Sequence, residues 1–325
     1  MKALICSEFG PASSLSLKML GADEPLGPTQ VRVRVNAAAL NFFDTLIIQG
    51  KYQFKPDLPF SPAGELAGEV EALGSEVTNL SVGDRVMAYT KWGAARQQVT
   101  LPAEQCFKLP AAVDDNHAAG VMITYGTAIH GLRNRAQVKA GETVAVLGAS
   151  GGAGLAAVEI AKAMGAKVIA CASSAEKLEI AREHGADELI NYAEQDLKAE
   201  LKSVDGGSGV DVVYDVVGGD YAEQALRALK WKGRYLVVGF AAGDIPRLPA
   251  NLMLLKGCDV RGVFWGRAIE EEPEAFNEDT EQLLAWLEAG VLKPRIHGVY
   301  SLEDYEQAFE EISSRRARGK VILRP

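Results

Sequence analysis

The chain has 325 residues, of which 48% are hydrophobic and 24% charged, and its net charge is -9 at pH 7. This composition indicates a globular protein of roughly two domains, and the acidic balance argues against a nucleic-acid-binding protein. No window approaches about eighteen apolar residues and the N-terminal apolar run is too short for a signal peptide, so we expect neither a membrane span nor export. The 4 cysteines are scattered without a CxxC pair, which predicts free thiols in a cytoplasmic protein.

From Met1 to about Val121 the sequence predicts short strands separated by glycine and proline. The segment "QVRVRVNAAAL" alternates apolar and polar residues, as a half-buried strand does. The segments "GELAGEVEALG" and "VGDRVMAY" read as further strands with turns between them. We expect this part to be a compact β-rich barrel or sandwich.

From about Met122 to Phe264 predicted strands alternate with helices, which indicates a doubly wound parallel sheet. The apolar stripe on about Tyr221 to Trp231 predicts one of these helices. The predicted strands are Val144–Leu147, Val168–Cys171, Glu188–Asn191, Val212–Val217, Arg234–Gly239 and Asp259–Phe264.

After Phe264 the alternation stops, and two amphipathic helices and a closing strand are predicted. The first helix lies in "PEAFNEDTEQLLAWLEAGVLKP", and the second lies in "SLEDYEQAFEEISSRR" behind a capping box at Ser301 and Asp304. The closing "GKVILRP" is the last strand. We expect this tail to rejoin the first domain.

A glycine cluster follows the apolar run Val144–Leu147 and precedes a helix that stops at Gly165. This strand–turn–helix context is typical of a dinucleotide-binding loop, in which glycines allow the tight turn, the approach of a pyrophosphate and close helix packing. The helix N-terminus attracts the phosphates. The alternative is a plain tight turn. The residues predicted to bind the cofactor here are Gly148, Ser150, Gly151, Gly152, Ala153 and Gly154.

The second predicted strand ends in "IACASSAEK", without the carboxylate that NAD-binding proteins use for the ribose 2′-hydroxyl. The hydroxyls of Ser173 and Ser174 and the cation of Lys177 suit a 2′-phosphate instead. Tyr192, just past the third strand, is expected to flank the adenine or reach the same phosphate. The alternative for Ser173 is helix capping with Glu176. The sequence therefore favours NADPH over NADH.

Several motifs spread over nearly the whole chain resemble the zinc-independent quinone oxidoreductases of the medium-chain dehydrogenase/reductase superfamily. These motifs are "NFFD" (Asn41–Asp44), "GKY" (Gly50–Tyr52), "VGDRV" (Val82–Val86), "TYGTA" (Thr124–Ala128), "GASGGAG" (Gly148–Gly154), "DVVGG" (Asp215–Gly219), "NLMLLKG" (Asn251–Gly257) and the final "GKVIL". The resemblance implies an α/β fold with a GroES-like catalytic domain, residues 1–122 and 266–325, and a Rossmann NADPH-binding domain, residues 123–265. It also implies a homodimer joined through the Rossmann edge strand "CDVRGVFW".

By the same resemblance, Asn41 and Tyr52 line the substrate end of a cleft, and Tyr52 donates a hydrogen bond to the substrate oxygen or relays a proton. Asp44 is expected to orient Asn41. The alternative for Asn41 and Asp44 is turn capping. Thr127 is counted with this catalytic group and, with Thr124, is expected to meet the nicotinamide carboxamide; the alternative for both threonines is back-bonding within a helix.

The remaining predicted cofactor contacts follow the fourth, fifth and sixth strands, at the carboxyl edge where parallel sheets bind ligands. The alternative for Phe264 is core or dimer packing. These residues are Val217, Gly218, Gly239, Phe240 and Phe264.

No metal site is predicted, because "SPAGELAGEV" replaces the Gly-His-Glu turn of the zinc members and the cysteines do not cluster.

The resemblance implies an NADPH-dependent reductase that passes a hydride to a quinone or an α,β-unsaturated carbonyl compound. The alternatives are an enoyl-thioester reductase, for which Lys51, Lys55 or Arg267 would contact a coenzyme A tail, and an NADPH-binding sensor without turnover. Trp92 lies in "KWGAARQQV", where many relatives have a glycine-rich turn, and is expected either to reshape the mouth of the substrate site or to pack at the surface.

Overall fold

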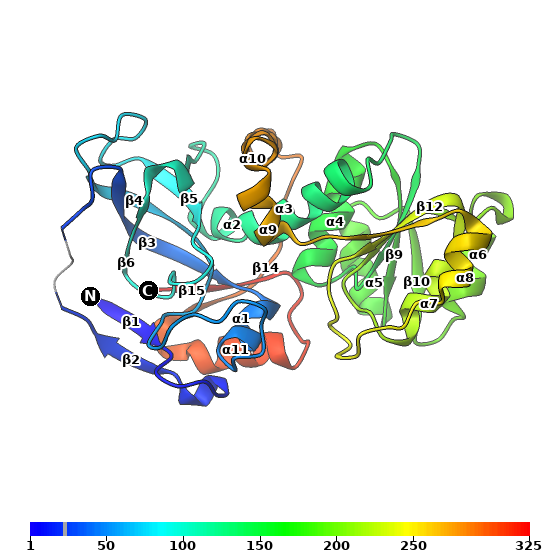
Figure 1. Cartoon of the computed structure of the whole chain (residues 1–325), viewed down its shortest axis with the longest axis horizontal. Coiled ribbons are helices and arrows are strands. Elements are labelled where there is room, and N and C mark those ends of the chain that lie inside the picture. The colour runs from blue at the N-terminus through cyan, green and yellow to red at the C-terminus, as the bar shows by residue number, and fades with distance from the viewer. Residues whose placement is uncertain (22–24) are drawn as a thin grey trace. The chain divides into compact units, whose positions relative to one another are not determined.

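The computed structural model describes residues 1–21 and 25–325, and the chain divides into two compact units (Figure 1). Unit 1 comprises Met1–Ile123 and Pro294–Pro325, and unit 2 comprises Thr124–Lys293. Among the described residues, no helix is both long and apolar enough to cross a bilayer. The four cysteines are buried free thiols, as the sequence predicts.

Unit 1 is built on a seven-stranded sheet in the order β14-β15-β3-β4-β5-β7, with β6 paired to β3, beside a separate antiparallel pair of β1 and β2. Its strands are β1 (Lys2–Ile5), β2 (Ser16–Met19), β3 (Gln30–Leu40), β4 (Glu65–Leu73), β5 (Arg85–Tyr89), β6 (Gln98–Pro102), β7 (Cys106–Lys108), β14 (Ile296–Ser301) and β15 (Lys320–Arg324). Its helices are α1 (Phe42–Ile47), α2 (Asp115–Ala119) and α11 (Tyr305–Ser313), with short 3-10 turns at Ala12–Ser14, Ala103–Gln105 and Leu302–Asp304.

The alternation read in the β3 sequence is confirmed by its burial. Val31, Val33 and Val35 are buried in the core of unit 1, while Arg34 on the other face is exposed. Alternate side chains point to opposite faces of a sheet, so this pattern fixes which face of β3 meets the core. The result is the β-rich, GroES-like domain that the sequence predicts.

The register of this sheet determines what surrounds the end of β3. Leu40 pairs with Val321 of β15 on one side, and Ala39 pairs with Glu65 of β4 on the other. Both neighbours run antiparallel to β3, so Lys320, the first residue of β15, lies opposite Asn41. Glu65, the first residue of β4, lies opposite Ala39, two residues before Asn41, and its side chain reaches the Asn41 side chain.

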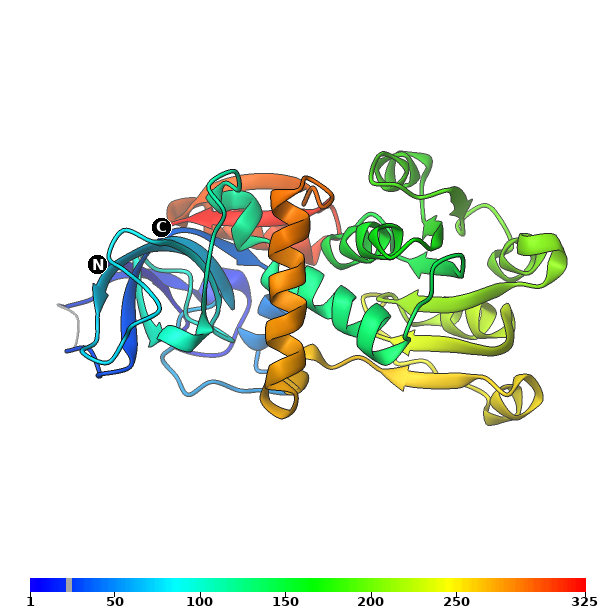
Figure 2. The ribbon, with the colours of Figure 1, turned by 90° about the horizontal axis from the view of Figure 1, so that it is seen from above.

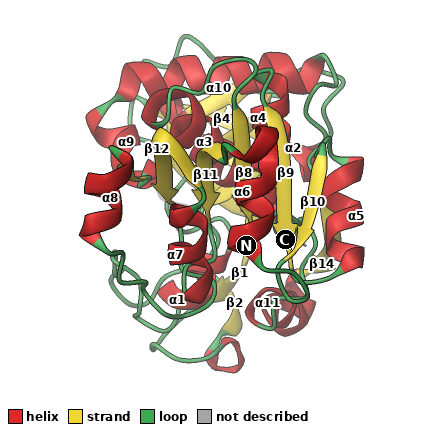
Figure 3. Ribbon diagram, turned by 90° about the vertical axis from the view of Figure 1, so that its right-hand side faces the viewer, coloured by secondary structure: helices red, strands yellow, loops and turns green. Residues whose placement is uncertain are grey.

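Unit 2 contains a six-stranded parallel sheet in the order β10-β9-β8-β11-β12-β13 (Figure 3). Numbered along this unit, that order is 3-2-1-4-5-6, the Rossmann arrangement that the strand–helix alternation predicts. The strands are β8 (Thr143–Leu147), β9 (Lys167–Ala172), β10 (Glu188–Asn191), β11 (Val210–Asp215), β12 (Leu229–Val237) and β13 (Asp259–Gly262).

Helices cover the faces of this sheet (Figures 1 and 3). The bounds are α3 (Met122–Ile129), which begins in unit 1, a π-helix at His130–Arg135, α4 (Gly152–Ala163), α5 (Ala175–Glu183), α6 (Leu197–Gly207), α7 (Asp220–Arg227), α8 (Ala250–Lys256), α9 (Trp265–Glu271) and α10 (Pro273–Glu288). Apolar residues of α6, α7 and α8 form one core cluster with alternate residues of the strands. Helices α4 and α5 contact β8, β9 and β10.

Several boundaries in unit 2 differ from the sequence prediction. The strands expected at Val212–Val217 and Arg234–Gly239 span Val210–Asp215 and Leu229–Val237. The helix expected from about Tyr221 to Trp231 ends at Arg227, because Leu229 already begins β12 and pairs with Val210. The sixth strand stops at Gly262 rather than Phe264, which is the N-cap of α9. Apolar residues continue across these last two boundaries, so the apolar pattern alone does not mark them.

The tail after residue 265 divides between the two units. Residues 294–325 return to unit 1 through β14, α11 and β15, as expected. Residues 266–293 were expected there too, but the structure groups them with unit 2. The reason is that Asp279 of α10 (Figure 2) is buried and accepts hydrogen bonds from Arg133 and Asn134 of the π-helix.

Candidate active site

The glycine loop of unit 2 has the local geometry that the sequence suggests. Gly148 leaves β8 with φ +74°, a conformation that favours glycine, and Gly151 is the N-cap of α4. A Cβ on Gly154 would collide with the carbonyl oxygen of Gly148 and lie 2.8 Å from Ala149 Cα. A Cβ on Gly151 would meet only that carbonyl oxygen, at 3.7 Å. The fold itself therefore requires glycine at 148 and 154 but leaves space beside 151.

At the end of β9, a serine, a lysine and a tyrosine come together. Lys177 Nζ donates to Ser173 Oγ at 2.9 Å, and the Tyr192 and Ser173 hydroxyls share a hydrogen bond. Burial raises the pKa of Tyr192 to about 12, so its hydroxyl stays protonated at neutral pH. The N-cap of α5 is Ser174, whose Oγ accepts from the Lys177 N–H at 3.4 Å. Capping thus belongs to Ser174, and Ser173 is not the cap proposed as its alternative role.

Tyr221, in the first turn of α7, is a member of this group that the sequence analysis did not identify. Its ring packs against the Tyr192 ring with centroids 4.2 Å apart. Aromatic pairs at this distance stabilise each other's position. The two residues are 29 positions apart by their numbering. One follows β10 and the other lies in α7, and only the fold brings these segments together, so no local pattern could have identified Tyr221.

The loops after β8, β11 and β12 gather at the carboxyl edge of the sheet. A Cβ on Gly148 would lie 2.9 Å from side-chain atoms of Val216 and Val217, and one on Gly218 would lie 3.1 Å from Phe240 Cδ1. This edge is where doubly wound sheets bind ligands. The structure thus brings together the residues predicted after three of the strands.

Asp215, the last residue of β11, holds one of these loops and was not singled out from the sequence. Its Oδ1 accepts from the N–H groups of Val217 at 2.7 Å and Gly218 at 2.9 Å, and its Oδ2 accepts from the Tyr235 hydroxyl. Burial raises the pKa of Asp215, and these three donors oppose the increase. The "DVVGG" motif contains this residue, but only the fold reveals its partners.

The remaining cofactor candidates of unit 2 lie in other elements. Thr124 is buried in α3 and Thr127 is half-buried one turn later. Gly239 follows β12, and its N–H donates to the Asp215 carbonyl oxygen. Phe264 is 43% exposed at the start of α9. Their roles toward a cofactor stay predictions.

In unit 1, Asn41 and Asp44 lie at the start of α1. One oxygen of Asp44 accepts from the backbone N–H of Asn41 at 2.7 Å, and the other accepts from the N–H of Ala63 at 3.1 Å. Burial raises the pKa of Asp44 to about 7, against the lowering effect of these donors and of Lys320. Asp44 therefore fixes the backbone of Asn41, as in a capping box. In return, the Asn41 side chain accepts from the backbone N–H of Asp44, whereas the Asp44 carboxylate itself binds backbone N–H groups.

The side chain of Asn41 is held by two residues that the sequence analysis did not select. Lys320 Nζ donates to Asn41 Oδ1 at 2.5 Å and to Glu65 Oε1 at 2.8 Å, and Asn41 Nδ2 donates to the same Glu65 oxygen at 2.9 Å. Glu65 Oε2 accepts from the N–H of Ile123 in the first turn of α3 at 2.8 Å. In the sequence, both residues are indicated only weakly: each is a charged residue at the start of a strand whose other residues are mostly apolar, Glu65 in β4 and Lys320 in β15.

Tyr52 lies near this group but makes mainly aromatic contacts. Its ring centroid is 5.3 Å from that of Phe43 and 6.2 Å from that of Phe54. Burial, and then the negative charge of Asp44, raises its pKa, so the hydroxyl remains a proton donor. Trp92 packs against the core of the same unit.

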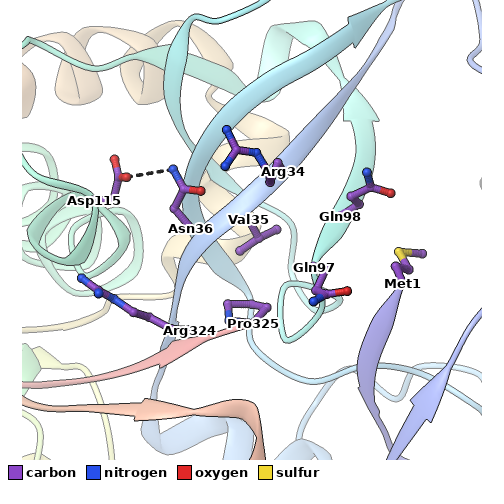
Figure 4. A pocket seen from close by; sticks show the side chains of 9 residues that line it. All are labelled: Met1, Arg34, Val35, Asn36, Gln97, Gln98, Asp115, Arg324 and Pro325. Carbon is purple, nitrogen blue, oxygen red and sulfur yellow. Dashed lines mark hydrogen bonds between the residues drawn. The ribbon is translucent and has the colours of Figure 1, made fainter.

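Unit 1 also has an open hollow of about 690 Å³ (Figure 4), lined by Met1, Arg34, Val35, Asn36, Gln97, Gln98, Asp115, Arg324 and Pro325. Its polar groups bind one another or their neighbours: Asn36 donates to Asp115 at 2.9 Å, and Arg34 pairs with Glu69 at 2.8 Å. None of the predicted site residues lines it. The hollow is therefore not part of the candidate site.

Residues suited to hold a metal ion do not come together in the described parts of the chain, where no three His, Cys, Asp or Glu side chains form a group. In the segment that replaces the Gly-His-Glu turn, a side chain on Gly64 would meet the Lys91 carbonyl oxygen at 2.6 Å and Phe43 Cζ at 2.9 Å. The donor set thus does not fit a zinc ion.

Comparison with known proteins places these features in a family. A family described as "Alcohol dehydrogenase GroES-like domain" matches residues 27–111, and one described as "Zinc-binding dehydrogenase" matches residues 152–288. The chain is 39% identical over 325 residues to a quinone oxidoreductase-like protein 2 homolog of Nematostella vectensis, covering 99% of this chain and 88% of that protein. It is 35% identical over 325 residues to the human quinone oxidoreductase, covering 99% and 97%.

Among solved structures, the quinone oxidoreductase of Escherichia coli complexed with NADPH matches with a TM-score of 0.92 at 31% identity, covering 100% of each chain. The match extends over both units, and the sequence motifs fall in both. The chain therefore belongs to the quinone oxidoreductase-like family of the medium-chain dehydrogenase/reductase superfamily.

Proposed function

We propose that this chain is an NADPH-dependent reductase that delivers a hydride to a quinone or an α,β-unsaturated carbonyl compound, without a metal ion in the step. Its family makes it an oxidoreductase that uses a nicotinamide cofactor. The observation that carries the proposal furthest is the group of Ser173, Lys177 and Tyr192 at the end of β9, where NAD-binding proteins place a carboxylate.

This group supports NADPH because it combines one cation with two hydroxyls. A ribose 2′-phosphate accepts hydrogen bonds and carries negative charge, which the Lys177 ammonium favours and a carboxylate would repel. The glycine loop supports a dinucleotide for a second reason. The open space beside Gly151 and the N–H groups at the start of α4 suit a pyrophosphate. We assign the other predicted contacts, including Ser150, Gly152, Ala153 and Ser174, to the same cofactor.

Bound NADPH would supply a hydride, which an enone would take at its β-carbon and a quinone at a carbonyl oxygen or a ring carbon, and the displaced electron pair would go onto a carbonyl oxygen. A proton from water would then complete the saturated ketone at its α-carbon, or the hydroquinone on oxygen, with enolisation where the hydride had gone to a ring carbon. Asn41 and Tyr52 can both donate hydrogen bonds to that oxygen as its charge grows, which lowers the barrier. We assign Thr124 and Thr127 to the nicotinamide carboxamide, and Val217, Gly218, Gly239, Phe240 and Phe264 to the walls around the nicotinamide.

The test follows the loss of reduced-nicotinamide absorbance with purified protein. NADPH and NADH are each offered with a benzoquinone, with an enone and with acrylyl-CoA. We expect oxidation of NADPH by the quinone or the enone, with a lower KM for NADPH than for NADH. Turnover of acrylyl-CoA alone would identify a thioester reductase. Tight NADPH binding without turnover would identify a non-catalytic binding protein.

We also propose that two copies pair through β13. This strand forms an edge of the described Rossmann sheet, and β12 and α8, which adjoin it in the sheet and in the chain, carry exposed apolar side chains: Trp231 is 67%, Leu254 79% and Leu255 69% exposed. An uncovered strand edge favours pairing with a second strand, and exposed apolar side chains favour burial in an interface. Buried free thiols agree with a cytoplasmic location, which is part of the same proposal.

A further inference from the structure

The amide of Asn41 contacts both members of a buried ion pair. Lys320 is 3% exposed and Glu65 is fully buried, while Asn41 itself is 8% exposed. Lys320 Nζ donates to the amide oxygen at 2.5 Å, the amide nitrogen donates to Glu65 Oε1 at 2.9 Å, and Lys320 Nζ lies 2.8 Å from the same Glu65 oxygen. Taking an ion pair out of water is costly, so the hydrogen bonds among these three side chains must offset a large penalty.

The chemistry of the two partners decides which way round the amide lies. An ammonium group only donates, so the amide atom facing Lys320 is the carbonyl oxygen. A carboxylate only accepts, so the atom facing Glu65 is the amide nitrogen. Turning the amide by 180° would set N–H groups against the ammonium and an oxygen against the carboxylate, and the low local dielectric makes both contacts costly.

These contacts leave Asn41 with one kind of hydrogen bond to offer. Its carbonyl oxygen accepts from Lys320 Nζ and, in the capping box, from the backbone N–H of Asp44, and one of its N–H groups donates to Glu65, so the capacity beyond the described contacts is the second N–H. We propose that Lys320 and Glu65 are positioning residues that fix the orientation of the Asn41 amide, so that Asn41 acts toward substrate only as a donor. This inference rests on the proposed function and specifies how its substrate oxygen is recognised.

Asn41 would then favour substrates that present a carbonyl oxygen over those that present a hydroxyl as donor. An amide free to turn could serve either, because its oxygen and nitrogen ends are nearly alike in shape. A fixed donor needs no reorganisation when charge develops on the oxygen. The Lys320–Glu65 pair would therefore act on kcat through Asn41.

The competing explanation is purely structural. Lys320 and Glu65 open β15 and β4, and the bond between them links the strands that flank β3. Removing Lys320 alone would leave a buried carboxylate without its cation and could unfold the chain. The useful variant is Lys320→Met combined with Glu65→Gln, which removes both charges and leaves an amide that can meet Asn41 in either orientation.

The experiment is a double-mutant cycle on kcat with NADPH and a benzoquinone. The charge-free variant is combined with Asn41→Ala, and the unfolding midpoint of every protein is measured. We expect the charge-free variant to lower kcat roughly tenfold or more in the natural background and less than about twofold in the Asn41→Ala background. Equal loss in both backgrounds would overturn the proposal, because the pair would then act independently of Asn41. The variant Lys320→Arg keeps a cation that only donates hydrogen bonds, so a kcat in this variant close to that of the natural protein would support the proposal.

The matched control is the Arg234–Glu142 pair in unit 2, a partly buried ion pair with 2.6 Å between its charged atoms. Arg234→Met with Glu142→Gln removes charges of the same kind. We expect it to lower the unfolding midpoint and to leave kcat within about twofold in both backgrounds. A similar fall in kcat there would mean that lost stability, not amide orientation, explains the result.

A second readout does not depend on turnover and separates this inference from the proposed function. The side-chain amide of Asn41 is assigned by ¹⁵N NMR from the signals that Asn41→Ala removes. We expect two resolved N–H signals in the natural protein, and broadened or faster-exchanging signals in the charge-free variant. Unchanged signals would overturn the orientation role even in an active enzyme, and a protein inactive with every acceptor would overturn the proposed function alone.

Discussion

Lys177 is the residue at which the cofactor assignment can be tested most directly. Its Nζ donates to Ser173 Oγ at 2.9 Å, and a 2′-phosphate there would gain a charge-assisted hydrogen bond. We predict that Lys177→Glu raises the KM for NADPH roughly ten- to hundredfold, the value of one such bond, and changes the KM for NADH little. Steady-state kinetics with both cofactors measures the ratio.

The control for this substitution is Lys198→Glu, which makes the same change of net charge at an exposed position of α6. We expect it to leave both KM values near those of the natural protein, because exposed charges at a distance are screened by salt. If the two variants shifted NADPH binding equally, the effect would come from overall charge, and Lys177 would have no special role.

Some residues of the candidate site could be selected from the sequence, and others could not. Ser173, Lys177 and Tyr192 could be selected because strand ends in a doubly wound sheet are ligand positions. Tyr221 could not, since its partner is distant along the chain and only the fold joins them. Lys320 stands in the quoted "GKVIL" motif, yet its contact with Asn41 depends on the register of β15 against β3.

At the scale of one element, alanine substitutions at two glycines, one in the loop before α4 and one in its first turn, are expected to have different effects. Gly154→Ala would push a methyl group into the Gly148 carbonyl oxygen. We predict that it lowers stability by about 2 kcal/mol, the typical cost of overpacking, even without cofactor. Gly151→Ala has an allowed backbone, with φ -77°, and open space, so the free protein should keep its stability.

The cofactor distinguishes the two substitutions further. If a pyrophosphate occupies the space beside Gly151, the alanine methyl group weakens NADPH binding roughly tenfold while the unfolding midpoint of the free protein stays unchanged. Calorimetric titration and thermal unfolding measure the two quantities. Unchanged NADPH affinity in Gly151→Ala would argue against a phosphate at this loop.

A second element-scale prediction concerns the opposite, amino-terminal end of the Rossmann sheet. Asp205 accepts from Thr143 Oγ1 at 2.6 Å and from Lys230 and Lys167 at 2.9 and 3.2 Å, which joins α6 to β8, β12 and β9. The Thr143 hydroxyl first, and then the Lys230 ammonium, holds the pKa of Asp205 at about 2. A lowered folded-state pKa means that Asp205 stabilises the fold above its ordinary pKa of 3.8 and loses this effect as the pH falls toward 2.

We therefore predict that Asp205→Asn lowers the free energy of unfolding at pH 7 by on the order of 1 kcal/mol, after allowance for solvent screening. Asparagine keeps the shape and tolerates the φ of +50° at this position. Urea unfolding from neutral to acidic pH should show the difference shrinking below the ordinary carboxyl pKa. Asp57→Asn, at an exposed position, is the control and should show no such dependence. A difference that persists at the lowest pH would mean that the charge of Asp205 is not its cause.

On the scale of the whole molecule, the order of the Rossmann sheet and the return of β14, α11 and β15 to unit 1 follow the sequence pattern closely. Strand–helix alternation leaves few topologies for a parallel sheet, and handedness reduces them further. The sequence pattern did not predict that α10 belongs to unit 2, because this placement depends on the buried contact of Asp279 with Arg133 and Asn134. An amphipathic helix reveals that it has a partner but not which one.

The last prediction concerns the pairing of two chains through β13. Gly262, the final residue of this strand, is exposed, and a Cβ built on it meets nothing within 4 Å. Gly262→Lys therefore adds a charge at the edge without a clash inside one chain. Lysine on an edge strand opposes strand pairing, because a second copy would bring an identical charge close to it.

Light scattering after size-exclusion chromatography should give about twice the 34.7 kDa of one chain for the natural protein and about one chain mass for Gly262→Lys. The matched control is Gly83→Lys in unit 1, an exposed position where a Cβ would also have no atom within 4 Å. The φ of +90° at Gly83 strains a lysine there, so circular dichroism must show that this variant is folded. A dimer that survives Gly262→Lys would show that the chains associate through another surface, and the exposed Leu254 and Leu255 of α8 would then be the next residues to change.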